Sequence, residues 1–301
     1  MRKLISLVLT LVMVLSSASC QVATNEPEES ISYASAKVSF LGPTGTYTQE
    51  ACEKFFNNEG EYLPYETVPQ AVEALVNGAS DYAVIPQENT IGGAVVDYVD
   101  TLIAQTSVSV VGEVELPINQ NLLVLPGTKL SDIKTVYSHK QGIAQGKDWL
   151  SQNLPDAEVI EVSSTAEGAR MISESKDPSC AAIASAGCAD VYGLEILANN
   201  IQNNDKNKTR FYVLSLAEPS QKKADRIAFI AKGKAEDLPK LLANIKSYNV
   251  TLITIHDRPL KTELGEYYYL VECADISYDT YQKIIFNNQL EFRYLGSFKV
   301  Y

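Results

Sequence analysis

Short apolar segments alternate regularly with amphipathic ones from Lys37 onwards, and this rhythm limits the fold more than any other feature. Residues 37–42 and 81–86 have the apolar composition of buried strands. Residues 48–56 and 67–78 space their apolar side chains as the buried face of a helix does. Because strands that alternate with helices form parallel sheets covered by those helices, the sequence predicts an α/β fold.

The alternation stops between residues 108 and 125, where two strand-like segments follow each other without a helix. We interpret this pair as a crossover into a second lobe, in which the alternation resumes. The prediction is a two-lobed region at residues 37–215, with lobe 1 at about 37–113 and 195–215 and lobe 2 at about 114–194. Two α/β lobes joined by crossing strands resemble periplasmic-binding-protein architecture and enclose a cleft.

A separate C-terminal unit is predicted at residues 224–301, after a polar linker. Its apolar patterns follow the order strand, helix, strand, strand, helix, strand. This βαββαβ order is typical of ferredoxin-like domains.

The N-terminal residues predict export. Arg2 and Lys3 precede a short apolar stretch, which is followed by small residues and then Cys20. This pattern indicates a signal peptide at residues 1–19 and is too short for a membrane-spanning helix. We expect Cys20 to carry a lipid anchor on a cell-envelope lipoprotein, with residues 20–36 as a polar tether; an ordinary secretory signal is the alternative.

Charge and metal-binding residues exclude some classes of function. The chain has 25 Lys and Arg against 37 Asp and Glu, a net charge of −12, which argues against a nucleic-acid partner. Its two histidines, His139 and His256, are far apart, and the cysteines lack zinc-site spacing, so we expect no metal. A disulfide between Cys180 and Cys188 is left open.

Polar residues gather where the predicted strands end, which is where open α/β sheets bind ligands. Glycines and the start of a helix follow the first strand, so backbone N–H groups there could meet an anion. Arg210 would supply the positive charge beside Thr209. The alternative is that each Ser, Thr or Asn merely caps its own helix. The other residues expected to converge are Thr44, Gly45, Thr46, Asn89, Thr90, Ser138 and Gln145.

Seven segments carry a family resemblance: FLGPTGTYTQEA, IPQENTIGGAVVDYVDTL, VYSHKQGIAQ, STAEGA, AAIAS, YGLEILANNIQ and NKTRFYVL. In this order and spacing they resemble the prephenate dehydratases over residues 38–214. The C-terminal unit resembles the ACT-type regulatory domain of that family, and its Arg258-Pro259 pair is similar to a regulatory motif.

The resemblance implies conversion of prephenate to phenylpyruvate, carbon dioxide and water in phenylalanine biosynthesis, without a cofactor or metal. It implies that Thr209 is the essential hydroxyl and that Arg210 pairs with a substrate carboxylate. His139 fits a structural role better than a catalytic one, and Glu88 fits an ion pair with Arg210. The implied substrate-binding residues are Thr44, Gly45, Thr46, Asn89, Thr90, Ser138, Gln145 and Phe211.

The regulatory unit departs from the family pattern. The Gly-Ala-Leu turn is replaced by KAEDLPKLL, and the Glu-Ser-Arg-Pro block by residues 256–259, His-Asp-Arg-Pro. These departures lead us to expect weak or absent phenylalanine inhibition. Because ACT-type units usually pair across a subunit interface, the resemblance implies a homodimer or higher homo-oligomer through residues 224–301. Two alternatives to the enzyme are an envelope solute-binding protein for an aromatic or carboxylate ligand and a non-catalytic amino-acid sensor.

Overall fold

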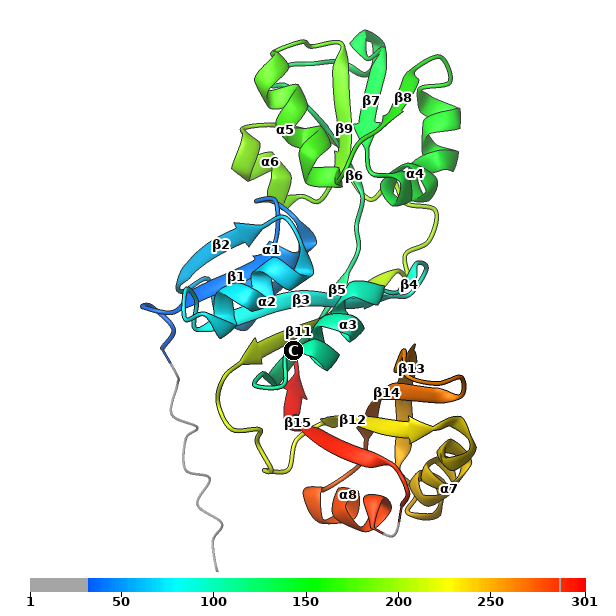
Figure 1. The fold of residues 1–301 in the computed structure, drawn as a ribbon. Coiled ribbons are helices and arrows are strands. Elements are labelled where there is room, and N and C mark those ends of the chain that lie inside the picture. The colour runs from blue at the N-terminus through cyan, green and yellow to red at the C-terminus, as the bar shows by residue number, and fades with distance from the viewer. Residues whose placement is uncertain (1–31, 287) are drawn as a thin grey trace, which may run out of the picture. The chain divides into compact units, whose positions relative to one another are not determined.

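A computed structural model describes residues 32–286 and 288–301. The predicted signal peptide and Cys20 lie outside the described residues, as does most of the predicted tether. The strands form one ten-stranded and one five-stranded sheet, with helices packed against both (Figure 1). The predicted α/β class and the two lobes are confirmed.

The first lobe is built on the sheet order β5-β11-β3-β1-β2, in which β1 is parallel to β2 and β3, and β11 is antiparallel to both of its neighbours. Its strands are β1 (Lys37–Leu41), β2 (Glu61–Tyr65), β3 (Tyr82–Asn89), β4 (Gly93–Ala94), β5 (Ser109–Pro117) and β11 (Lys208–Ser215). Its helices are α1 (Tyr47–Phe55), α2 (Val68–Val76) and α3 (Val96–Ala104).

Helices cover both faces of this sheet because its strands are apolar on both sides. Phe211 and Val213 of β11 pack in a core with α1. Tyr212 and Leu214, one residue further along in each case, pack in a second core with α2 and α3. This alternation fixes which side chains of β11 share a face.

The second lobe has the sheet order β10-β6-β9-β7-β8. Its strands are β6 (Asn121–Val124), β7 (Thr135–Ser138), β8 (Glu158–Glu161), β9 (Cys180–Ala184) and β10 (Glu195–Ala198), and its helices are η1 (Leu130–Asp132), α4 (Lys140–Asn153), α5 (Thr165–Ser175) and α6 (Gly187–Tyr192). Residues 195–198, expected in lobe 1, belong to this sheet instead, because β10 pairs antiparallel with β6. The return to the first lobe is made by β11.

The C-terminal unit has the predicted βαββαβ order and an antiparallel sheet in the order β13-β14-β12-β15. Its elements are β12 (Arg226–Lys234), η2 (Ala235–Asp237), α7 (Leu238–Ser247), β13 (Thr251–Pro259), β14 (Glu266–Ala274), α8 (Tyr278–Ile285) and β15 (Glu291–Val300).

The end of β15 joins this unit to the first lobe. Lys299 and Val300 pair in parallel with β5, so one sheet runs through both parts. At the junction Gly296 has a φ of +140°, and a Cβ there would lie 2.5 Å from the carbonyl oxygen of Val110. Only glycine fits this close approach between β15 and β5.

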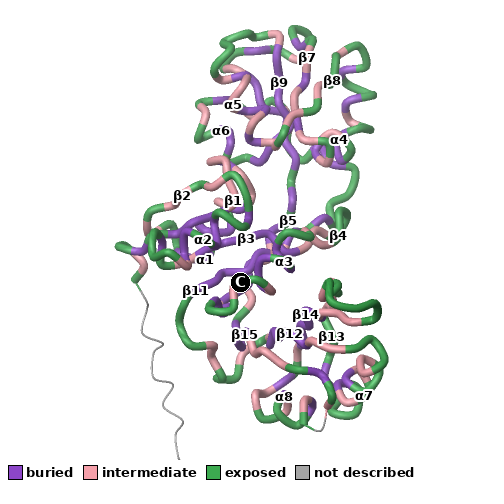
Figure 2. The backbone as a smooth tube through the Cα atoms, viewed as in Figure 1, coloured by how far each residue is buried: buried purple, intermediate pink, exposed green. Residues whose placement is uncertain are grey.

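Burial follows the sheets, whose central strands are the most deeply covered (Figure 2). None of the described helices is long and apolar enough to cross a membrane.

Candidate active site

A cavity of about 350 Å³ is lined by residues of both lobes. The first lobe contributes the end of β3, the start of β11 and the first turn of α1. The second lobe contributes the first turns of α4 and α5. The lining residues include Thr46, Tyr47, Thr48, Pro86, Asn89, Gln120, His139, Gln141, Gly142, Gln145, Ser164, Thr165, Thr209 and Phe211.

Thr209 lies at the start of β11 with only 8% of its surface exposed. Its Oγ1 accepts a 2.9 Å hydrogen bond from Asn89 Nδ2. The Asn89 amide is held in this orientation, because its Oδ1 accepts hydrogen bonds from the backbone N–H groups of Ile91 and Gly92 at 3.0 and 2.8 Å. No acceptor among the described residues takes the Thr209 proton, so the hydroxyl is free to donate to a molecule in the cavity.

Three helices begin at the cavity. Thr46 precedes α1, His139 precedes α4 and Ser164 precedes α5. The first backbone N–H groups of a helix lack intrahelical partners and carry partial positive charge, which favours anions. Among the described residues that line the cavity, none is Lys or Arg. Any carboxylate bound there would therefore be held by helix N-termini and neutral side chains.

His139 has the structural role favoured by the sequence. Its Nδ1 accepts a hydrogen bond from the Gln141 N–H at 3.3 Å, which caps α4. Ser164 caps α5 in the same way by accepting from the Glu167 N–H at 3.0 Å. Both side chains line the cavity, and each accepts a hydrogen bond from a backbone N–H group in the first turn of its helix.

Arg210 requires a correction. Its guanidinium donates to Glu88 at 2.8 Å and to Glu272 of β14 at 2.7 Å, and it does not line the cavity. Successive side chains of a strand point to opposite faces, so Arg210 points away from the cavity that Thr209 and Phe211 line. The geometry does not support its expected pairing with a substrate carboxylate. The ion pair anticipated between Arg210 and Glu88 is confirmed.

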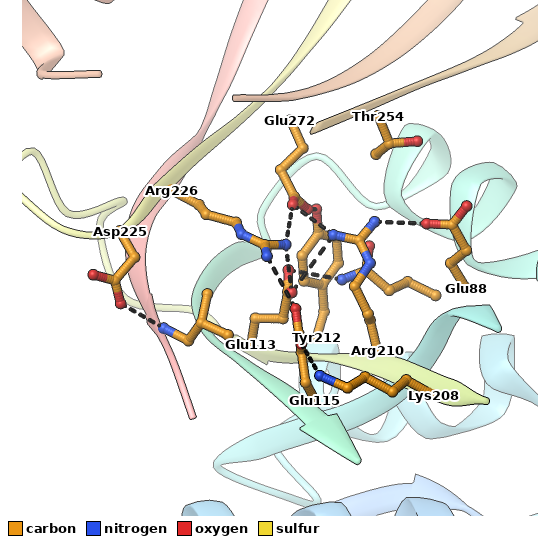
Figure 3. A network of polar contacts seen from close by, with 12 residues as sticks. Glu88, Glu113, Glu115, Lys208, Arg210, Tyr212, Asp225, Arg226, Thr254 and Glu272 are labelled. Atoms are coloured by element: carbon orange, nitrogen blue, oxygen red, sulfur yellow. Dashed lines mark hydrogen bonds and ion pairs between the residues drawn. The ribbon is translucent and has the colours of Figure 1, made fainter. Parts of the chain in front are cut away.

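Behind β11 lies a largely buried group of charges, here called the charge cluster: Glu88, Glu113, Arg210, Arg226 and Glu272 (Figure 3). The side chains of Glu113 and Glu272 are fully buried. Burial, and next the nearby Glu272 carboxylate, raise the pKa of Glu113 to about 8.

Three other predicted residues lie around the cavity but do not line it. Thr44 and Gly45 face the second lobe through their carbonyl oxygens, which accept hydrogen bonds from Tyr192 Oη at 2.8 Å and from Ser185 Oγ at 2.9 Å. Ser138 is buried inside the second lobe, where its hydroxyl donates to the Ile183 carbonyl at 2.7 Å. These contacts give the three residues structural roles outside the cavity lining.

Thr90 also lies outside the cavity lining. Its hydroxyl donates to the Lys208 carbonyl at 3.1 Å and accepts from the Lys208 N–H at 3.2 Å. Thr90 therefore ties the segment after β3 to the start of β11.

Gln120 is a cavity residue that the sequence pattern did not reveal. It follows β5 in the crossover between the lobes, is 2% exposed, and donates to Gln145 Oε1 at 2.9 Å. Its own Oε1 is buried without a partner in the described structure. Only its place in the crossover could have pointed to it, because connections between lobes border the cleft.

The described residues contain neither a disulfide nor a cluster of potential metal ligands. Cys180 and Cys188 are buried free thiols, so the disulfide left open by the sequence is not formed. No cluster of three or more potential metal ligands occurs within the described ranges.

The two residues expected to be regulatory, Arg258 and Pro259, lie on β13, far along the chain from the cavity-lining segments. Arg258 donates to both carboxylate oxygens of Asp100 in α3, at 2.5 and 2.7 Å, and Pro259 ends the strand. A second cavity of about 340 Å³ adjoins the altered turn and is lined by Ala235, Leu238, Ile255, Asp257, Tyr267 and Tyr269.

Comparison with known proteins identifies the family. A family model described as "Prephenate dehydratase" matches residues 38–219. The chain belongs to the prephenate dehydratase family. The prephenate dehydratase of Bacillus subtilis (strain 168) is 32% identical over 256 residues, which cover 78% of this chain and 87% of that protein. The matched region contains every cavity-lining residue named above.

Two further relatives extend the comparison. The bifunctional chorismate mutase/prephenate dehydratase of Neisseria gonorrhoeae is 35% identical over 237 residues, covering 78% of this chain. The match spans 65% of that relative, less than two thirds of its length. The crystal structure of the Arthrobacter aurescens prephenate dehydratase in complex with L-Phe has a TM-score of 0.79 at 28% identity, covering 88% of this chain and 90% of that chain.

Proposed function

We propose that the protein is a prephenate dehydratase, which converts prephenate to phenylpyruvate with loss of carbon dioxide and water. The observation that carries the proposal is the Thr209 hydroxyl, which accepts from Asn89 and keeps its proton for a ligand in the cavity. Family membership and the relatives named as prephenate dehydratases support the same reaction.

The reaction breaks two bonds of one ring. The bond to the ring carboxylate breaks to release carbon dioxide, and its electron pair enters the ring as the bond to the ring hydroxyl breaks. The departing oxygen gains negative charge and leaves as water after protonation. A hydrogen bond from Thr209 to that oxygen strengthens in the transition state and so accelerates the reaction.

The substrate carries two carboxylates, and the cavity offers them helix N-termini. The first turns of α1, α4 and α5 supply backbone N–H groups, while Gln120 and Gln145 supply side-chain amides. Phe211 and Pro86, which pair across β11 and β3, give the ring an apolar floor. Binding of the carboxylates, which we first expected of Arg210, is thus assigned to the helix N-termini and the side-chain amides.

The test is incubation of the purified protein with prephenate while the absorbance of phenylpyruvate is followed. Turnover that saturates with prephenate supports the enzyme. Binding of prephenate or phenylpyruvate by calorimetry without turnover would instead favour the envelope solute-binding protein and reject the catalytic role.

We propose that the C-terminal unit is an ACT-type regulatory domain that pairs with a second copy of the chain. Its βαββαβ order and the edge strand β13, with Leu252 and Ile253 more than a third exposed, support this pairing. The altered turn before α7 places Glu236 and Asp237 near the second cavity, where they would repel the carboxylate of an amino acid.

We also propose that the protein is exported and anchored by a lipid on Cys20. The basic residues Arg2 and Lys3, the short apolar stretch and the small residues before Cys20 support this proposal. Metabolic labelling with palmitate in a bacterial host tests it. Label that disappears in Cys20→Ser supports the anchor, whereas an unlabelled wild-type chain in the soluble fraction rejects it.

A further inference from the structure

The strand β3 contains an irregularity directly beside Thr209. In its pairing with β11, Thr209 faces Asn89 and Arg210 faces Glu88, but the next residue, Phe211, faces Pro86. Gln87 is thus an extra residue, and β3 has a β-bulge at this point. Bulges change the direction of the side chains that follow them and are frequent next to active sites.

The bulge decides which face Asn89 occupies. Pro86 and Asn89 both line the cavity although they are three positions apart, a spacing that would put them on opposite faces of a regular strand. On the other face, Glu88 belongs to the charge cluster and the Gln87 side chain donates to Glu113 of the same cluster. Without the bulge, Asn89 would point away from Thr209.

Two contacts hold the bulge from behind. Gln87 Nε2 donates to Glu113 at 2.9 Å, and Glu88 accepts from Arg210 at 2.8 Å. The backbone carbonyl of Gln87, which the ladder with β11 skips, accepts from the Val95 N–H at 2.9 Å. Glu113 and Gln87 are fully buried, so their contact is shielded from water, whereas the Glu88 side chain is one-third exposed.

The same contacts continue into the C-terminal unit. Glu272 of β14 accepts from Arg210 at 2.7 Å and from Arg226 of β12, also at 2.7 Å. Arg226 in turn donates to Glu113 at 2.6 Å. The contacts that support the bulge therefore include two residues, Arg226 and Glu272, that lie outside residues 38–219, the region matched by the family model.

We propose that Gln87, Glu88 and Arg210 are positioning residues that hold the bulge, so that Asn89 and Thr209 share the cavity face. We propose further that Glu272 makes this geometry depend on docking of the C-terminal unit. The inference rests on the proposed dehydratase function. Under this inference Arg210, the residue after Thr209, acts on the site from the face of β11 opposite the cavity.

The physical reason lies in the burial of the groups that Glu88 and Glu272 contact: Arg210 is 12% exposed and Arg226 is 14% exposed. Removing one charge from a buried set leaves its partners uncompensated, and the neighbouring backbone relaxes to rehydrate them. A shift of about 1 Å at Asn89 would weaken its hydrogen bond to Thr209, and misplacement of that size costs up to roughly 100-fold in rate. Substrate binding would change little, because none of these three residues lines the cavity.

The experiment compares Glu88→Gln and Glu272→Gln with Asp100→Asn. Asp100 also joins the first lobe to the C-terminal unit, through Arg258, but contacts neither the bulge nor the charge cluster. We expect each Glu variant to lower kcat on prephenate by roughly 10- to 100-fold with KM within about three-fold. Asp100→Asn should keep kcat within about two-fold, as expected for an exposed ion pair.

A double variant tests whether the effect passes through Asn89. If Glu88 acts by placing Asn89, then Asn89→Ala with Glu88→Gln should have the kcat of Asn89→Ala alone. Multiplied losses in the double variant would overturn the proposal. So would Glu variants that match Asp100→Asn.

A structural measurement keeps the inference separate from the proposed function. In a crystal structure of Glu88→Gln, we expect a lengthened distance between Asn89 Nδ2 and Thr209 Oγ1. An unchanged contact would reject the inference even if the wild type turns over prephenate. An inactive wild type would reject the function alone. Glu88 is one-third exposed, so this variant should fold even if Glu272→Gln does not.

Discussion

Asn89 Nδ2 lies 2.9 Å from Thr209 Oγ1, and the two residues face each other across the antiparallel pair β3 and β11. Asn89 acts as the donor because backbone N–H groups occupy its amide oxygen. Thr209 can therefore direct its own proton only into the cavity. This one contact sets the direction of the hydroxyl and leads to the first two predictions.

Thr209→Ala should lower kcat by about 10²–10⁴-fold with KM within a few-fold, because the hydroxyl acts on charge that develops in the transition state. Thr209→Ser should keep much of the activity, since it retains both the donor and the acceptor. Steady-state kinetics on prephenate measure both. Normal turnover by the alanine variant would reduce Thr209 to a hydroxyl at a strand end.

Asn89→Asp should be more harmful than its similar shape suggests. A carboxylate only accepts hydrogen bonds, so it would take the Thr209 proton that the substrate needs. We expect kcat to fall by roughly 100-fold or more, in the range of losing one general-acid contact. Kinetics compared with Asn89→Ala check the sign of the effect. An aspartate variant more active than the alanine variant would contradict this orientation of the hydroxyl.

Glu113 predicts a pH dependence of stability. Its folded-state pKa of about 8 exceeds the ordinary value of 4.5. Between these values the folded chain holds a proton that the unfolded chain lacks. This contribution is therefore complete below pH 4.5 and is lost as the pH rises through 8. The free energy of unfolding from urea titrations should fall more steeply between pH 5 and pH 8 in the wild type than in Glu113→Gln. Parallel profiles would show that Glu113 titrates normally.

Gly296→Ala tests the junction between β15 and β5. The added Cβ would lie 2.5 Å from the Val110 carbonyl oxygen, at a φ of +140° that other residues rarely adopt. We expect a loss of about 2–3 kcal/mol in the free energy of unfolding. Gly187→Ala is the control, because its nearest neighbour would be Ser185 Oγ at 3.9 Å. Equal stability of the two variants would mean that the strands separate easily at Gly296.

The C-terminal unit should form a dimer that responds weakly to phenylalanine. Light scattering of the purified protein measures the mass, and activity across a phenylalanine titration measures the response. The acidic turn before α7 is the physical reason for the weak response. Strong inhibition at low micromolar phenylalanine would show that this turn still completes a ligand pocket. A monomer at all concentrations would reject the pairing.

The sequence alone predicted most of the helices and strands and indicated Thr209 as a candidate site residue. Apolar spacing predicts helices and strands because it reflects local burial, and the βαββαβ order of the C-terminal unit follows from it. Ser164 could be recognised as a helix cap, since a cap depends on residues three positions apart. Thr209 could be selected as a candidate because it begins a predicted strand beside the cleft, and the order of strands along the chain is visible in the sequence.

The tertiary structure decided which side chains face the cavity. From the sequence we expected both Thr209 and Arg210 at the cavity, but neighbouring residues of a strand point to opposite faces, and only Thr209 lines it. The Gln87 bulge, which returns Asn89 to the side of Thr209, arises only from pairing with β11. Gln120 and Glu272 likewise come together with their partners from 25 and 62 residues away. Such contacts depend on how strands pack and where charges are buried, and no local pattern in the sequence encodes them.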